Sequence, residues 1–115
     1  MSVPVALDEL REEIARFGPS PYLITVSDDS RPHAVAVTVA WDGDRLAAGA
    51  GRSTSANASA RPMVSMLWPP HEPEGYSLIV DGEATLDGDR LLLAPSRAVL
   101  HRPKAGPGMD CVTVL

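Results

Sequence analysis

Residues 33–41 alternate strictly between bulky and small side chains. In the run HAVAVTVAW, a histidine, three valines and a tryptophan take the odd positions, and alanine or threonine takes each even position. Successive side chains of a β-strand point to opposite faces of the sheet. The run therefore predicts a strand with one bulky face and one shallow face.

Five further segments read as short strands, and turn residues separate them. Asp42-Gly43-Asp44 and Asp87-Gly88-Asp89 are tight hairpin signals. We expect the fifth strand to bulge at Gly82 and the sixth to be interrupted near Pro95. The six predicted strands span residues 22–27, 33–41, 45–49, 63–68, 76–86 and 90–101.

An amphipathic helix is predicted before the strands, at residues 7–17. Leu7, Leu10, Ile14 and Phe17 recur every three or four residues, and Gly18 follows the last of them. A helix followed by hairpin-connected strands predicts an all-β fold with minor α, a closed antiparallel barrel. One domain should span residues 1–115, with its barrel at about 21–102 and an extended tail at 103–115.

Composition restricts the partners and the compartment. The net charge of −5 and the few aromatic residues argue against a nucleic-acid partner. No run approaches the roughly 20 apolar residues of a membrane span, and the N-terminal stretch does not resemble a signal peptide. Cys111 is the single cysteine, so no internal disulfide forms, and no Cys/His cluster offers a metal site. The sequence thus predicts a cytoplasmic protein without a structural metal.

Positive charge is concentrated in the middle of the chain. From Arg45 to His71 there is no Asp or Glu, whereas Arg45, Arg52 and Arg61 all fall in that stretch. One small anion could bind there. The alternative is that the three arginines simply solvate a surface.

The segment GAGRSTSANASAR, at residues 49–61, has the composition of an anion-binding turn. We expect Ser53 or Thr54 to cap a short helix that Pro62 closes. The N–H groups of its first turn, together with Arg52, would then face a bound phosphate. On composition alone, an ordinary connection between strands is the alternative.

Between residues 7 and 103 these features follow one another in a distinctive order. The order is a helix, the YLITV strand, the Arg31-Pro32-His33 turn, the valine-rich strand, a hairpin, the glycine and hydroxyl loop with Asn57, Arg61-Pro62, and a strand with Val64-Ser65. It resembles the pyridoxamine 5′-phosphate oxidase-like split barrels that bind FMN or its deazaflavin relative. The resemblance implies a six-stranded antiparallel split β-barrel with Greek-key connections and a short helix between strands three and four.

The resemblance also implies a homodimer with the flat cofactor between its subunits. The implied activity is an FMN- or deazaflavin-dependent oxidoreductase acting on a small molecule, in which the cofactor carries the hydride chemistry and no side chain need be catalytic. The positions that match the family's cofactor site are Val37 and Thr38 beside the ring, and Arg52, Ser53, Thr54 and Asn57 around the phosphate.

Two kinds of aromatic residue stand apart from that set. Trp68 could stack on the cofactor ring, or it could belong to the core or the dimer interface. His33, His71 and His101 are far apart and have no partner at metal-ligand spacing, so surface or hydrogen-bonding roles are expected.

One position departs from the family pattern. The family commonly has Lys or Arg near Thr54, whereas Thr54 and Ala56 are uncharged here, and Arg52 is the residue that could replace the base. The rival interpretation is a barrel that holds a flavin or haem without turnover, or a structural dimer without a cofactor. The arginine-rich C-terminal segment of the true oxidase is also missing, so vitamin B6 chemistry is not expected.

Overall fold

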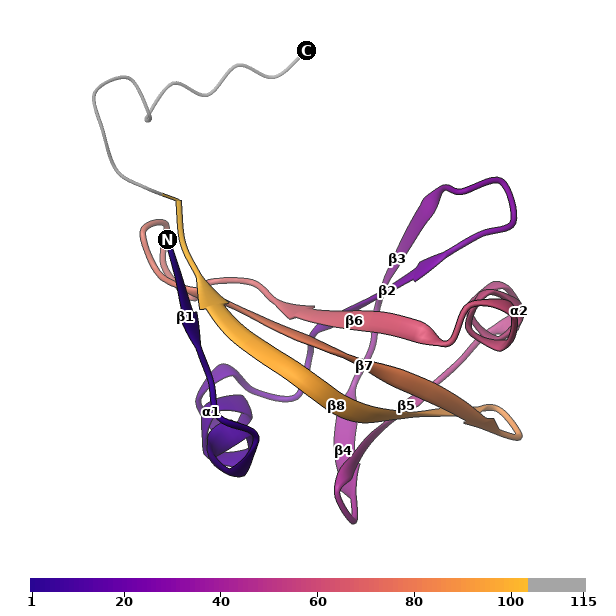
Figure 1. Ribbon diagram of the computed structural model, residues 1–115, viewed down its shortest axis with the longest axis horizontal. Coiled ribbons are helices and arrows are strands. Elements are labelled where there is room, and N and C mark those ends of the chain that lie inside the picture. The colour runs from indigo at the N-terminus through magenta and orange to yellow at the C-terminus, as the bar shows by residue number, and fades with distance from the viewer. Residues whose placement is uncertain (104–115) are drawn as a thin grey trace.

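The computed structural model describes residues 1–103, which form one antiparallel sheet with two helices (Figure 1). Apart from Pro103, the predicted tail, including Cys111, lies outside the described residues. In chain order the elements are β1 (Ser2–Pro4), the 3-10 turn η1 (Leu7–Glu9), α1 (Leu10–Phe17), β2 (Tyr22–Val26), β3 (Pro32–Ala36), β4 (Val39–Asp42), β5 (Arg45–Gly49), α2 (Arg52–Ala60), β6 (Met63–Trp68), β7 (Ser77–Asp87) and β8 (Arg90–His101).

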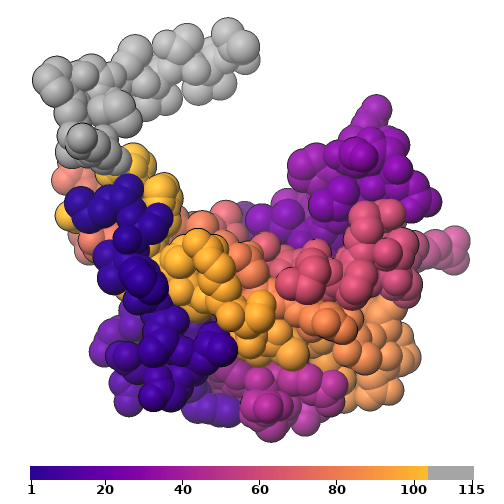
Figure 2. All heavy atoms as spheres, viewed as in Figure 1, coloured from indigo at the N-terminus to yellow at the C-terminus, as the bar shows by residue number. Residues whose placement is uncertain are grey.

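The sheet has eight strands in the described chain, in the order β3-β2-β6-β7-β8-β5-β4, with β1 also paired to β8. All pairings are antiparallel. The sheet curls into a half-barrel, and the β2–β3 hairpin projects from the body of the molecule (Figures 1 and 2). The prediction of a mainly β, antiparallel split-barrel-like fold is confirmed. The prediction of six strands in a closed barrel is wrong. Among residues 1–103 the sheet has eight strands, and it stays open because β3 and β4 lie at its two ends without pairing to each other.

The predicted strand at residues 33–41 is two strands. β3 pairs with β2, and β4 pairs with β5, so the chain changes partner at Val37 and Thr38. Across this bend the N–H of Val37 donates to the carbonyl of Pro21 at 3.0 Å, and that of Val39 to the carbonyl of Pro19 at 2.8 Å. The alternation is nevertheless correct, since the odd positions are at least partly buried and the even ones are exposed.

Both Asp-Gly-Asp signals form the predicted hairpins. Asp42 pairs with Arg45, and Asp87 pairs with Arg90, which leaves two-residue loops. The first loop residue is glycine in each, at φ of 64° and 62°, where other residues are strained. Arg90 joins the two hairpins, because it donates to the carboxylates of Asp87 and Asp42 at 3.2 and 3.3 Å. The hydrogen bond to Asp87 raises the pKa of Arg90 most, and the hydrogen bond to Asp42 raises it further.

One bulge explains both irregularities expected in the last two strands. Gly82 pairs with Pro95, whereas Asp81 pairs with Arg97, so Ser96 is the extra residue and β8 runs through without interruption. Neither β5 nor β1 pairs with this middle part of β8. Pro95, which has no N–H to donate, is therefore tolerated there. A side chain at Gly82 has no room, because its Cβ would lie 2.2 Å from the carbonyl oxygen of Ala94.

The core is aliphatic and lies on one face of the sheet, where α1 adds two side chains to it. Leu10 and Ile14 of α1 are buried, which confirms the amphipathic pattern. Burying side chains of this size contributes about 1.5–3 kcal/mol each. The fully buried sheet residues include Leu23, Leu46, Met66, Leu78, Val80, Leu91 and Leu93. Within the described part of the chain, no helix is long and apolar enough to cross a membrane.

Candidate functional site

The glycine and hydroxyl segment ends in α2, as predicted, but its cap differs. Gly51 is the N-cap, in an extended backbone conformation, and no side chain bonds to the helix start. The N–H of Ser55 donates to the carbonyl of Gly51 at 2.9 Å. The prediction that Ser53 or Thr54 caps the helix is therefore wrong, because the helix starts earlier, at Arg52. The N–H groups of residues 52–54 precede that first bond and have no acceptor within the helix.

The side chains predicted around the phosphate divide into two groups. Arg52 and Ser53 are exposed at the start of α2, and Arg52 makes no salt bridge to residues 1–103. Thr54 and Asn57 are only 4% and 8% exposed, because they face the sheet. The helix start thus offers an arginine, a hydroxyl and backbone N–H groups to solvent, while the inward residues hold the helix in place.

Asn57 fixes α2 to the neighbouring strand. Its Nδ2 donates to Oγ1 of Thr25 on β2 at 3.1 Å, and Thr25 is 1% exposed. This side-chain contact joins residues far apart in the chain and is buried, so its loss leaves polar atoms without water. Asn57 therefore positions the helix start in this structure.

Arg61, at the other end of α2, is committed to a second anchor. Its Nε donates to the carbonyl of Val26 at 2.8 Å, and an Nη donates to Asp28 at 2.7 Å. The charge of Arg61 is thus paired. Of the three arginines in the acid-free stretch, Arg45 and Arg52 have no carboxylate partner among residues 1–103.

Val37 and Thr38 lie at the bend between β3 and β4. Val37 is half-buried on the core-facing side, and Thr38 is exposed on the other. The recorded hydrogen bonds of residues 1–103 tie this bend to the loop before β2 and do not join it to α2. The structure therefore brings Thr54 and Asn57 together with Thr25, and leaves the two ring positions as a separate group.

Trp68 lies in the core. Its side chain is 1% exposed, and Nε1 donates to the carbonyl of Gly18 at 2.7 Å. No ring face is left for a cofactor, so of the roles considered for Trp68 the core role is the one found. Trp68 takes no further part in the candidate site.

His33, which the sequence placed among residues with surface or hydrogen-bonding roles, lies beside the bond between Thr25 and Asn57. It pairs in register with Thr25, and its Nδ1 is buried with no hydrogen-bond partner among the described residues. Directly opposed residues in a sheet share a face, so His33 lies on the face that carries the Thr25–Asn57 bond. The one feature that marks His33 is its position opposite the buried Thr25. That position is known only once the register of β2 and β3 is known.

The chemistry available here is that of anion binding. A helix start with unpaired N–H groups and an arginine favours a phosphate, and the partnerless Nδ1 of His33 can take a hydrogen bond from, or give one to, a bound group. In the described chain, no three His, Cys, Asp or Glu side chains are close enough to hold a metal ion.

Known proteins resemble this chain in sequence or in fold. No family model matches the chain. Two uncharacterized mycobacterial proteins, Mb0449c of Mycobacterium bovis and MT0457 of Mycobacterium tuberculosis, are each 40% identical to it over 82% of this chain and 84% of theirs.

Among solved structures, a FAD-binding protein from Mesorhizobium loti superposes with a TM-score of 0.65 at 14% identity, over 90% of this chain and 98% of that one. An F420 reductase superposes with a TM-score of 0.54 at 24% identity, over 82% and 93%. A Listeria innocua protein provisionally assigned as a pyridoxamine 5′-phosphate oxidase gives 0.58 at 17% identity, over 86% and 95%. The chain therefore belongs to the same family as the two mycobacterial proteins, and its fold is that of the pyridoxamine 5′-phosphate oxidase-like split barrels.

Proposed function

We propose that this chain is an oxidoreductase that binds a phosphate-bearing flavin, FMN, or the deazaflavin F420, at the start of α2. The observation that carries the proposal is the exposed helix start, where Arg52, Ser53 and free backbone N–H groups share one end of an anchored helix. A bound flavin or deazaflavin supplies the hydride chemistry. The work of the chain is then to bind, orient and shield the cofactor.

The phosphate would lie against the first turn of α2. An anion there gains from the helix dipole and from charge-assisted hydrogen bonds to Arg52. Thr54 is uncharged and faces the sheet, so Arg52 is the cation that this helix start offers. The bonds of Asn57 and Arg61 keep the helix start from moving when the anion binds.

The flat ring would lie along the bend at Val37 and Thr38. The even positions of this segment are small and exposed, which leaves a shallow surface on which a planar group can lie. The proposed assembly is a homodimer that covers the cofactor. In its support, the outward face of β2, β3 and β6 exposes Tyr22 and Met63, which are 45% and 58% exposed, beside Ala34 and Ala36. A face of this kind is typical of an interface.

The first experiment is to record the absorbance of the purified protein and then titrate it with FMN and with F420, following fluorescence. Saturable binding of one of them, at tens of micromolar or tighter, is the expected result. If neither FMN nor F420 binds, the proposed cofactor site is refuted.

Arg52→Ala tests the position of the phosphate. Loss of a charge-assisted contact of about 1.5–3 kcal/mol weakens binding roughly ten- to a hundred-fold. Arg45→Ala is the matched control, since Arg45 also lacks a carboxylate partner among residues 1–103 but lies at the far end of β5 from α2. Equal effects of the two variants would remove Arg52 from the site.

The second candidate function is a non-catalytic carrier of flavin or haem, or a structural dimer. Its support is Thr54, which is uncharged at a position where the family commonly has a base. Reduction of the bound cofactor separates the candidates. A flavin that no nicotinamide reduces, or an F420 that exchanges no hydride with any acceptor tested, favours the carrier.

A further inference from the structure

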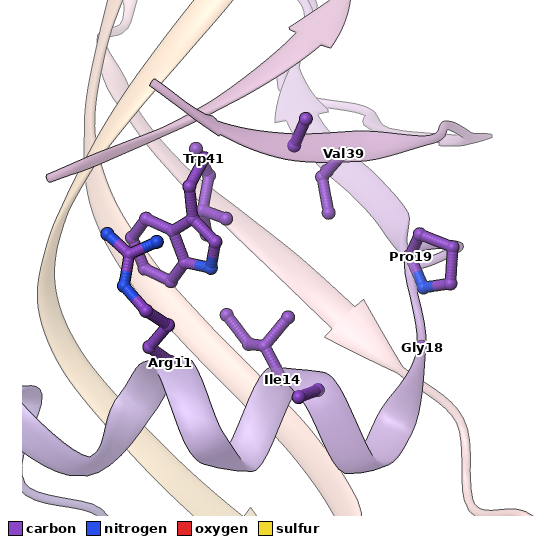
Figure 3. A pocket seen from close by; sticks show the side chains of 9 residues that line it. Arg11, Ile14, Gly18, Pro19, Val39 and Trp41 are labelled. Atoms are coloured by element: carbon purple, nitrogen blue, oxygen red, sulfur yellow. The ribbon is translucent and has the colours of Figure 1, made fainter. Parts of the chain in front are cut away.

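A hollow lies away from α2, between α1 and β4. It is a cavity of about 290 Å³ whose walls come from α1, from the turn after it, and from β4 and β5. Figure 3 shows Trp41 and Val39 on the strand facing Ile14 and Arg11 on the helix. None of the residues placed in the cofactor site lines it.

The walls of this cavity are apolar. Ile14, Val39 and Leu46 are buried core residues at its floor, and the half-buried Trp41 also lines it. Small-ligand sites are mostly apolar with a few polar groups, and this hollow, which is open to solvent, has walls of that kind. The space thus suits one ring or a short branched chain.

Arg11 is the charged group of the cavity wall. Its guanidinium lies over Trp41, with Cζ 4.3 Å from the ring centroid, and one Nη donates to the carbonyl of Gly43 at 2.8 Å. Arg11 makes no salt bridge to residues 1–103. Four of the five guanidinium N–H groups are outside the bond to Gly43. The guanidinium of Arg11 therefore has no salt-bridge partner among residues 1–103, and its contacts with Trp41 and Gly43 hold it in place.

The neighbouring acids limit how much negative charge an occupant can carry. Asp8 and Asp44 line a separate hollow that Arg11 and Trp41 also border. Neither carboxylate forms a salt bridge with Arg11, so the guanidinium is available. Both carboxylates repel an anionic ligand, and they repel a dianion about twice as strongly as a monoanion. A single negative charge fits best.

We propose that this cavity binds a small apolar molecule with one carboxylate, its apolar part between Ile14, Val39 and Trp41 and its carboxylate on Arg11. The inference goes beyond the proposed oxidoreductase and does not depend on a cofactor at α2. Charge complementarity and the apolar walls carry it together, because neither a neutral ligand nor a large anion uses both features.

Phenylacetate is the probe, titrated into the full chain while amide and indole signals are followed by NMR. A ligand of this size should bind with a Kd on the order of 1 mM. The shifts should be largest at Ile14, Val39 and Trp41, with the amide signals of α2, which does not line the cavity, as internal reference. Phenylacetamide, which has the same shape but no charge, should bind at least ten-fold more weakly.

Arg11→Gln should raise the Kd for phenylacetate at least ten-fold. Arg16→Gln is the control, because Arg16 lies on the same helix, pairs with Glu13 and does not line the cavity. The thermal midpoint of each variant checks that both remain folded. The proposal is overturned if phenylacetate does not saturate, if its shifts map elsewhere, or if Arg11→Gln and Arg16→Gln bind it equally.

Discussion

Replacing Asn57 with alanine should destabilise the protein through one buried hydrogen bond. The bond from Asn57 Nδ2 to Thr25 Oγ1 is 3.1 Å long, and both residues are buried. Its net contribution is about 0.5–1.5 kcal/mol, and the stranded Thr25 hydroxyl adds a desolvation cost of about 1–3 kcal/mol. Asn57→Ala should therefore lower the free energy of unfolding by about 1.5–4.5 kcal/mol.

The double-mutant cycle with Thr25→Val isolates the contact. Each single variant leaves one polar group without its partner, whereas the double variant removes both groups. The double variant should thus lose about 1 kcal/mol less than the sum of the single losses. Urea unfolding measures this, because a loss of 2 kcal/mol lowers the midpoint by roughly 1 M at an m-value near 2 kcal/mol/M.

Additive losses would refute the reasoning, since they would mean that the two side chains do not interact. The cofactor titration provides a second measurement. If Asn57 positions the start of α2, then Asn57→Ala weakens FMN or F420 binding even where the variant is fully folded. Arg52→Ala, by contrast, should weaken binding without changing stability.

Two further substitutions test the sheet and the core. Gly82→Ala should cost about 3 kcal/mol or more of unfolding free energy, because the new Cβ would lie 2.2 Å from a β8 carbonyl oxygen. The control is Gly49→Ala on β5, which should cost under about 0.5 kcal/mol because no atom lies within 4 Å of its new Cβ. Equal midpoints in urea would contradict this. Trp68→Phe should cost about 2 kcal/mol, since it strands the Gly18 carbonyl and leaves a gap, and Trp41→Phe should cost less. The reverse order in thermal unfolding would place Trp68 outside the core.

The strands were predicted correctly where side chains alternate every two residues and turn residues mark both ends of the segment. β5 and β6 have the predicted bounds, and both hairpins form where Asp-Gly-Asp stands. The bend at Val37 was invisible, because the alternation continues through it and only the pairing partner changes. β1 was missed for another reason: three exposed residues carry no periodicity, and its partner lies at the far end of the described chain.

The candidate site was predictable as a segment but not as a set of contacts. The residue types pointed to a helix with an exposed start, and α2 is there. Which side chains face outward depends on where the helix begins. The serines, alanines and single threonine of this segment do not fix that starting residue. The core position of Trp68 depends on the Gly18 carbonyl that it reaches, a contact between segments that no local pattern contains. The cofactor and the dimer stay predictions.

The position of β8 has a consequence for how this chain folds. β8 pairs with β7 through a two-residue hairpin, with the earlier β5, and with β1, where Val3 meets Leu100. Hairpins form within about 1–10 μs, whereas pairings between distant segments must first overcome the entropy of closing a long loop. The β7–β8 hairpin therefore provides an early template with a free edge. We expect the strand from the start of the chain, which pairs with β8 through three residue pairs, to join it last and to leave it first.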